Sequence, residues 1–230
     1  MNFYKKRCLN TAYEAGNVLF LILIAVALFA ALSYAVTQSS RGGGDAQNEN
    51  VKTQASQIVQ YSASVKTAIQ RMMLMGGYTY RQVDSQGPGS NNSNCPDDGC
   101  RVFSPDHYGV SYVPPKEEWL VPENSNARWG EYRISHFPVD GLGTNQPELV
   151  WLLHYVKEPI CMEINESLGL TSSGAAVPEQ VLYINTLAWY TGATTGGNRL
   201  YDTGGVLYGQ EIGCFREGAN SVFYQVLDIK

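Results

Sequence analysis

Five cysteines carry the clearest chemistry in this chain of 230 residues. Cys8 stands apart near the N-terminus, and the remaining four form an even set of the kind that pairs in an oxidising compartment. Three pairings are arithmetically possible. The stretch Cys-Pro-Asp-Asp-Gly-Cys bends easily, which favours a local Cys95–Cys100 bond and leaves Cys161 to join Cys214. In the chain-entropy model the long-loop bond would stabilise the fold by roughly 4 kcal/mol and the short one by roughly 2 kcal/mol.

Metal binding has weak support in the sequence. A zinc site of four thiolates needs two close pairs, whereas Cys161 and Cys214 are 53 residues apart. Calcium near Asp97 and Asp98 is a weak interpretation: these carboxylates, with Asp106 and loop carbonyls close by, are ligands that Ca²⁺ prefers, but acidic loops are commonly just solvated. The histidines are scattered, with no two of them at the spacing of metal ligands: His107, His136 and His154.

The motifs of common enzymes are missing from the chain. No GxSxG, HExxH or P-loop sequence occurs, and Gly141-Leu142-Gly143 does not continue into a dinucleotide-binding fingerprint. On a strand, Glu117 and Glu118 would point to opposite sides and make a poor acid–base pair. The sequence therefore predicts neither an enzyme nor a cofactor.

Four tryptophans allow two interpretations. Exposed indole rings would stack on sugars or on another protein, although packing in the core is the commoner use of such large side chains. The tryptophans in question are Trp119, Trp129, Trp151 and Trp189.

An uncharged apolar segment spans residues 18–36. As a helix it would be about 28 Å long, close to the hydrocarbon thickness of a bilayer. Basic residues precede it at Lys5, Lys6 and Arg7, so residues 1–17 should form a basic leader that stays in the cytoplasm. The rest of the chain would then lie on the far side of the membrane.

Two fates of this segment are open. Small residues at Ser33-Tyr34-Ala35 would suit removal as a secretory signal, leaving Val36 as the new N-terminus. Its apolar run is longer than that of a usual signal peptide, and no helix breaker precedes the cleavage site, which favours a retained anchor.

Beyond the segment the sequence predicts an α+β fold. Residues 37–50 form a polar linker or a helix continuation, and apolar residues then recur every three or four positions, which predicts an amphipathic helix over 51–77. Residues 78–230 should form a β-rich head outside the cytoplasm, with an antiparallel sheet and a short helix over 159–169. The long N-terminal helix, membrane-spanning in its first part, should pack on this disulfide-braced sheet. The strand-like runs are 101–103, 108–113, 132–137, 148–156, 180–183, 205–208 and 222–229.

Charge argues against nucleic acid as a partner. From residue 37 onward the chain has 13 basic and 20 acidic residues, a formal net charge of −7. Such a domain repels a phosphate backbone, because nucleic-acid affinity rests largely on lysine and arginine.

This order of features resembles the type IV pilins and the pseudopilins of type II secretion. The matching features are Lys5-Lys6-Arg7, Gly16, the run 18–36, the helix from about 51 to 75, and the Cys161/Cys214 bracket. In that family a prepilin peptidase cuts after the glycine, and apolar helices then pack into a filament core. The resemblance implies that Gly16 is the last leader residue and that Asn17 is the first mature one. Proteins of the tight-adherence pilus system, with a similar Gly-Asn-Val entry, are an alternative relative.

One position departs from the family. A glutamate is usual at the fifth mature position, where it pairs with a neighbouring N-terminus, but this chain has Leu21 there and Glu14 upstream. A minor pseudopilin of the filament tip also lacks this glutamate. The departure therefore argues against a major, self-polymerising subunit.

These observations predict a single-pass inner-membrane protein with a cytoplasmic N-terminus and a periplasmic or extracellular head. Its expected role is that of a pilin-like structural subunit, a minor component of an envelope filament or secretion apparatus. Its partners would be the membrane and other pilin-like or envelope proteins. The alternative is a signal-anchored extracytoplasmic domain that binds a carbohydrate or a peptide.

Overall fold

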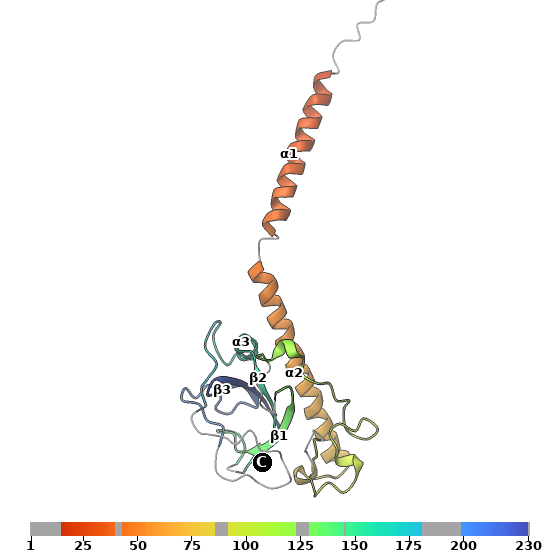
Figure 1. Cartoon of the computed structure of the whole chain (residues 1–230), viewed down its shortest axis with the longest axis vertical. Coiled ribbons are helices and arrows are strands. Elements are labelled where there is room, and N and C mark those ends of the chain that lie inside the picture. Colours follow the sequence, from red (N-terminus) through yellow and green to blue (C-terminus); the bar gives the residue numbers. More distant parts are fainter. Residues whose placement is uncertain are drawn as a thin grey trace, which may run out of the picture. The chain divides into compact units, whose positions relative to one another are not determined.

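A computed structural model describes residues 15–39, 43–85, 92–122, 129–144, 146–180 and 199–229 (Figure 1). The chain divides into two compact units, Met1–Asn48 and Glu49–Lys230, and each is described by itself. The basic residues Lys5, Lys6 and Arg7, together with Cys8, lie outside the described residues.

The first unit contains helix α1 (Ala15–Ser39). Its sequence has no charge and no proline, and leucine and alanine dominate it, so nothing interrupts the backbone hydrogen bonds. The stretch Val18–Val36 has a mean hydropathy of 2.7 and none of it is buried. Among the described residues it is the one helix long and apolar enough to cross a membrane; a signal sequence meets the same criterion.

Helix α2 (Gly43–Met75) carries the amphipathic pattern and begins earlier than the predicted residue 51. Residues 37–50, predicted as a polar linker or a helix continuation, are mostly helical. Helix α1 continues to Ser39 and α2 begins at Gly43, while residues 40–42 are not described. The helix ends where Gly76 donates its amide to the Met72 carbonyl at 3.0 Å and Gly77 takes a φ of +70°. A glycine adopts that left-handed conformation at little cost, which explains the stop.

Four antiparallel strands form one sheet in the order β1-β2-β4-β3. The long central strands are apolar on both faces, since every residue of β2 is buried. A sheet with two buried faces needs a cover on each. The strands are β1 (Tyr132–Phe137), β2 (Glu148–Val156), β3 (Ile212–Glu217) and β4 (Asn220–Asp228).

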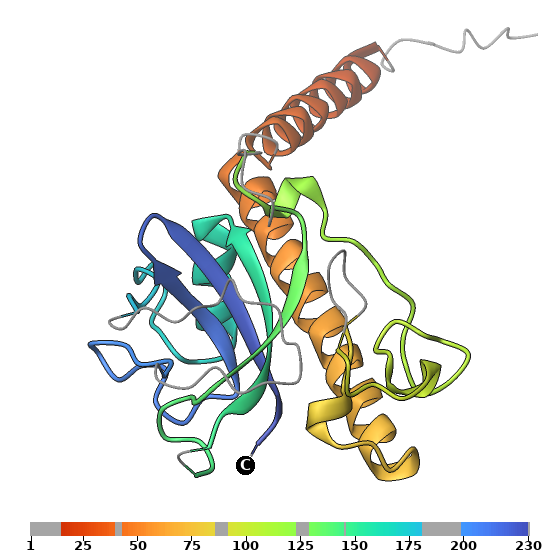
Figure 2. The same cartoon turned by 60° about the horizontal axis from the view of Figure 1, so that its bottom comes forward.

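One face of the sheet is covered by α2 and by α3 (Glu158–Ser167) (Figure 2). Residues 92–122 pack beside α2, while a polar side of this helix, which includes Lys52, Gln60 and Gln70, stays exposed. The buried core here includes Ile58, Val65, Ile69 and Met72 of α2, Trp151 and Leu153 of β2, Ile160 and Ile164 of α3, and Phe223 of β4.

The opposite face has a second apolar core. Val150 and Leu152 of β2 and Val222 and Tyr224 of β4 point to it, and Leu200 and Leu207 cover them from the segment before β3. This segment lies beside the β1–β2 connection. Leu200 donates its amide to the carbonyl of Pro138 in that connection at 2.8 Å.

Several predicted strands are wrong. Residues 101–103, 108–113 and 205–208 form turns and irregular segments, with only a single bridge between Asp84 and Arg101. The edge strand β3 was missed because Gly213, Arg216 and Glu217 weaken its strand character. The predicted strand at 180–183 lies mainly outside the described residues.

Candidate functional site: an exposed apolar helix and a disulfide-braced head

Helix α1 presents an uninterrupted apolar surface. All side chains from Val18 to Val36 are exposed, including Leu21 at 59%. Gly16 and Asn17, the residues on either side of the expected cleavage point, lie in the first turn of this helix. An apolar surface of this size is unfavourable in water and requires lipid or other helices around it.

Polar contacts as well as apolar ones fix α2 on the sheet. The Ser62 hydroxyl, fully buried, donates to Oε1 of Gln225 in β4 at 2.8 Å. One turn further on, Lys66 forms an ion pair with Glu211 just before β3. These contacts fix the helix in register against β4 and β3, so α2 is an integral part of the head.

The disulfide between Cys161 and Cys214 ties α3 to β3, with Cα atoms 5.4 Å apart. Beside it the buried side chain of Asn165 accepts the amide N–H of Cys214 at 2.8 Å and donates to the Cys214 carbonyl at 3.0 Å. The Asn165 side chain therefore satisfies both backbone groups of Cys214 that a further strand would otherwise bind. The sheet edge is thereby closed both covalently and by hydrogen bonds.

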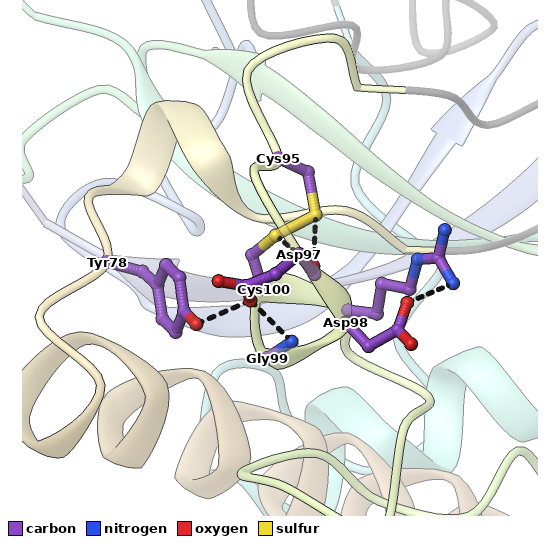
Figure 3. Close-up of polar contacts among 7 residues, drawn as sticks. Tyr78, Cys95, Asp97, Asp98, Gly99 and Cys100 are labelled. Atoms are coloured by element: carbon purple, nitrogen blue, oxygen red, sulfur yellow. Dashed lines mark hydrogen bonds and ion pairs between the residues drawn. A yellow bond between two sulfur atoms is a disulfide. The ribbon is translucent and has the colours of Figure 1, made fainter.

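The second disulfide, between Cys95 and Cys100, closes a short loop near the C-terminal end of α2 (Figure 3). The loop folds around Asp97, which accepts the hydroxyl of Tyr78 at 2.6 Å and the amide of Gly99 at 2.8 Å. Tyr78 lies two residues beyond Gly76, so this hydrogen bond attaches the loop to the end of the helix. The structure thus contains the two bonds that the cysteine spacing favours.

Electrostatics reinforce this contact. The hydrogen bond from Tyr78 holds the pKa of Asp97 below its ordinary value, with help from the Gly99 amide. The same hydrogen bond raises the pKa of Tyr78 to about 12. The neutral phenol and the ionised carboxylate are therefore the stable pair over the whole physiological range.

The loop does not support the calcium interpretation. Asp97 is engaged by Tyr78 and Gly99, and Asp98 pairs with Arg101 at 2.5 Å. Within the described ranges no group of three or more histidines, cysteines or acidic residues is placed to hold a metal ion.

The remaining candidate residues are dispersed. His136 stacks on Tyr80 with ring centroids 5.3 Å apart, His154 is buried in β2, and His107 is exposed in a turn. Glu117 and Glu118 lie on a short 3₁₀ helix, Glu117–Trp119, instead of the assumed strand. The structure does not bring these groups together into a catalytic arrangement.

The tryptophans do not form an exposed stacking platform in the described part of the chain. Trp119 and Trp151 are buried in the core, and the half-buried Trp129 donates its indole N–H to the Val121 carbonyl at 2.7 Å. Trp189 falls outside the described residues.

One surface feature was missed by sequence reasoning. A hollow of about 340 Å³ lies between the β1–β2 connection, residues 138–144, and the segment that includes Arg199 and Tyr208. Its only signal in the sequence is the pair Gly141 and Gly143.

Comparison with known proteins gives no relative for this chain. No protein-family model, no curated protein and no solved structure matches it. Its function must therefore be argued from the residues and their geometry.

Proposed function

We propose that this chain is a membrane-anchored structural subunit of the pilin type, acting as a minor component of an envelope filament or secretion apparatus. The anchor would supply lateral contacts with neighbouring apolar helices, and the head would supply recognition of a partner. No covalent chemistry is required of such a subunit, because its free energy of assembly comes from helix packing.

The observation that carries this proposal is the combination of two helices in one chain. Helix α1 exposes apolar side chains over the whole of 18–36, and the next helix, α2, buries one face against an antiparallel sheet. A signal peptide alone would not require that second helix. Two disulfides in the head support a location outside the cytoplasm.

The uncharged residue Leu21 refines the proposed role. With no carboxylate at Leu21, the helix has no charge in its first turns to pair with the amino terminus of a neighbour. Such a helix would enter an existing bundle by apolar packing, which suits a subunit present in few copies.

The mature N-terminus tests the proposal directly. Mass spectrometry of the protein from its native membrane should find Asn17 as the first residue, because peptidase processing removes the leader. Gly16→Leu should leave the chain at Met1, whereas Ala15→Ser, one residue away, should still be processed. Val36 as the first residue in the native protein would contradict the proposal, since the anchor would then be lost.

The second candidate is the signal-anchored binding domain, and one observation favours it. The hollow at residues 138–144 is open to solvent and lined by polar groups, which can orient a polar ligand through hydrogen bonds. In this case the native protein would begin at Met1.

A further inference from the structure

We propose that the hollow bounded by residues 138–144, Arg199 and Tyr208 is a carbohydrate-binding site for a neutral hexose unit. This proposal concerns the head alone and does not depend on how the N-terminus is processed. It differs from the tryptophan site predicted from the sequence, since no tryptophan among the described residues lines this hollow.

The lining has the two components that sugar recognition needs. Asp140 and Arg199 form an ion pair at 2.7 Å, and together they offer planar acceptors and donors that match the paired hydroxyls of a hexose. Tyr208, 62% exposed, supplies an aromatic face for the C–H side of the ring.

Glycines open the site to close approach. A Cβ added at Gly141 would lie 2.8 Å from the ring of Tyr208 and 2.6 Å from the amide nitrogen of Gly209, so only glycine fits beneath that ring. Gly141 has a φ of +79°, which also favours glycine. Gly143 is exposed in the same wall and leaves its backbone accessible to a ligand.

The two walls are held together before any ligand arrives. Gly209 donates its amide to the Asp140 carbonyl at 2.8 Å, and Asp140 donates its own amide to the Leu200 carbonyl at 3.0 Å. The buried carboxylate of Asp202 accepts the amides of Val206 and Leu207 at 2.9 and 3.0 Å, which shapes the turn that carries Tyr208. A preorganised site loses less entropy on binding.

Other ligand classes fit less well. An apolar ligand would cover the polar groups that make up most of the exposed lining, and a phosphate would meet, among the described lining residues, a single guanidinium already paired with Asp140. The acidic head, with its formal net charge of −7, further disfavours anions. A neutral polyol avoids both penalties.

The site lies at one end of the head. The β1–β2 connection is at the same end of the head as the C-terminus of α2 (Figure 2). The stacking of Tyr80, just past α2, on His136 near the end of β1 agrees with this placement.

The test uses the full-length chain in lipid nanodiscs, so that no sugar-headed detergent competes for the hollow. Saturation-transfer NMR with the methyl glycosides of glucose, galactose, mannose and N-acetylglucosamine should show binding of at least one of them. Tyr208→Ala and Asp140→Asn should each weaken that binding about tenfold, since each removes one of the two recognition elements. Tyr208→Phe should retain it, because the ring face is unchanged.

Tyr112→Ala is the matched control, because Tyr112 is similarly exposed but packs with Phe103 and Tyr132 on the α2 side of the sheet. It should bind the same glycoside as the unaltered chain. Binding of none of the four glycosides, displacement by inorganic phosphate, or undiminished binding by Tyr208→Ala would each overturn the proposal. Unchanged near-ultraviolet circular dichroism of the variants shows that any loss is local to the hollow.

Discussion

Glu148 is a buried carboxylate at the start of β2, and its two oxygens differ in their hydrogen bonding. Its Oε2 accepts the amide N–H of Val139 at 2.7 Å, whereas Oε1 has no hydrogen-bond partner among the described residues. Burial disfavours the charged form and raises the pKa of Glu148 above its ordinary value. The residue fixes one wall of the hollow through Val139 at an electrostatic cost.

A pH dependence of stability follows from this carboxylate. Because its folded pKa is raised, its contribution is fully present below the unfolded value of 4.5 and is lost as pH rises through the folded pKa. Glu148→Gln should remove that loss and raise the free energy of unfolding near neutral pH by about 1 kcal/mol, because a neutral amide avoids the cost of burying a charge. Denaturant titrations at acidic and neutral pH measure this. Glu117→Gln, at an exposed position, is the control, and a pH profile of Glu148→Gln equal to that of the unaltered chain would contradict the argument.

The hydrogen bond between Tyr78 and Asp97 titrates at both ends of the pH scale. Because the pKa of Asp97 is lowered in the folded state, its contribution to the free energy of unfolding is present above its pKa in the unfolded chain. That contribution is lost as pH falls through its pKa in the folded chain. The pKa of Tyr78, raised to about 12, means that its contribution is present below pH 10 and is lost as pH rises through 12. Asp97→Asn should return the pKa of Tyr78 toward 10. The pKa is measured from the tyrosinate absorbance of Tyr78, which is obtained by subtracting the titration of the Tyr78→Phe variant. Asp98→Asn, at the neighbouring carboxylate, should leave that pKa near 12.

Residue-level chemistry was partly predictable. The spacing of the cysteines favoured the observed pairing among three possible ones, because Pro96 and Gly99 let a short loop close. The partner of Asp97 could not be predicted, since Tyr78 precedes it by 19 residues and only the fold brings the two side chains together. Two neighbouring aspartates therefore suggested calcium, whereas a phenol and an arginine satisfy them.

At the scale of elements, α2 holds the head together through one buried face. Ile69 is fully buried in the core between α2 and the sheet, whereas Leu74, little more than one turn later, is 85% exposed. Ile69→Ala should lower the free energy of unfolding by about 2–5 kcal/mol, because it removes buried methyl groups and leaves a cavity. Leu74→Ala is the matched control and should change it by less than about 0.5 kcal/mol. Chemical denaturation followed by tryptophan fluorescence measures both, and equal effects would show that α2 does not pack as described.

The helices were more predictable than the sheet. A period of three to four apolar residues identifies α2 by itself, because both the helix and its buried face are local properties. A strand exists only with a neighbour, so the Val- and Tyr-rich run 108–113 lacks a ladder while the Gly-containing β3 has one. The side chain of Asn165, which closes the edge of β3, could not be assigned from sequence either.

At the scale of the whole molecule, the chain combines two parts with opposite solvent requirements. The part around Val18–Val36 has no buried side chain and no charge, whereas the head buries an apolar core on each face of its sheet. The sequence predicted this division, because hydropathy and charge are sums over long segments and do not depend on packing detail. The hollow at residues 138–144 was not predictable, since its walls come from segments almost 60 residues apart.

Membrane attachment is the property on which the proposed assembly depends. Two arginines near the centre of the apolar segment, Val26→Arg with Leu28→Arg, should cost on the order of 6 kcal/mol of insertion free energy. We expect the unaltered chain to stay with the membrane through alkaline carbonate extraction and the double variant to be lost from that fraction. Val26→Leu with Leu28→Val keeps the composition and should behave as the unaltered chain. If the unaltered protein is extracted by carbonate with its N-terminus at Val36, the segment is a removed signal, and α1 cannot provide the lateral contacts of a pilin-type subunit.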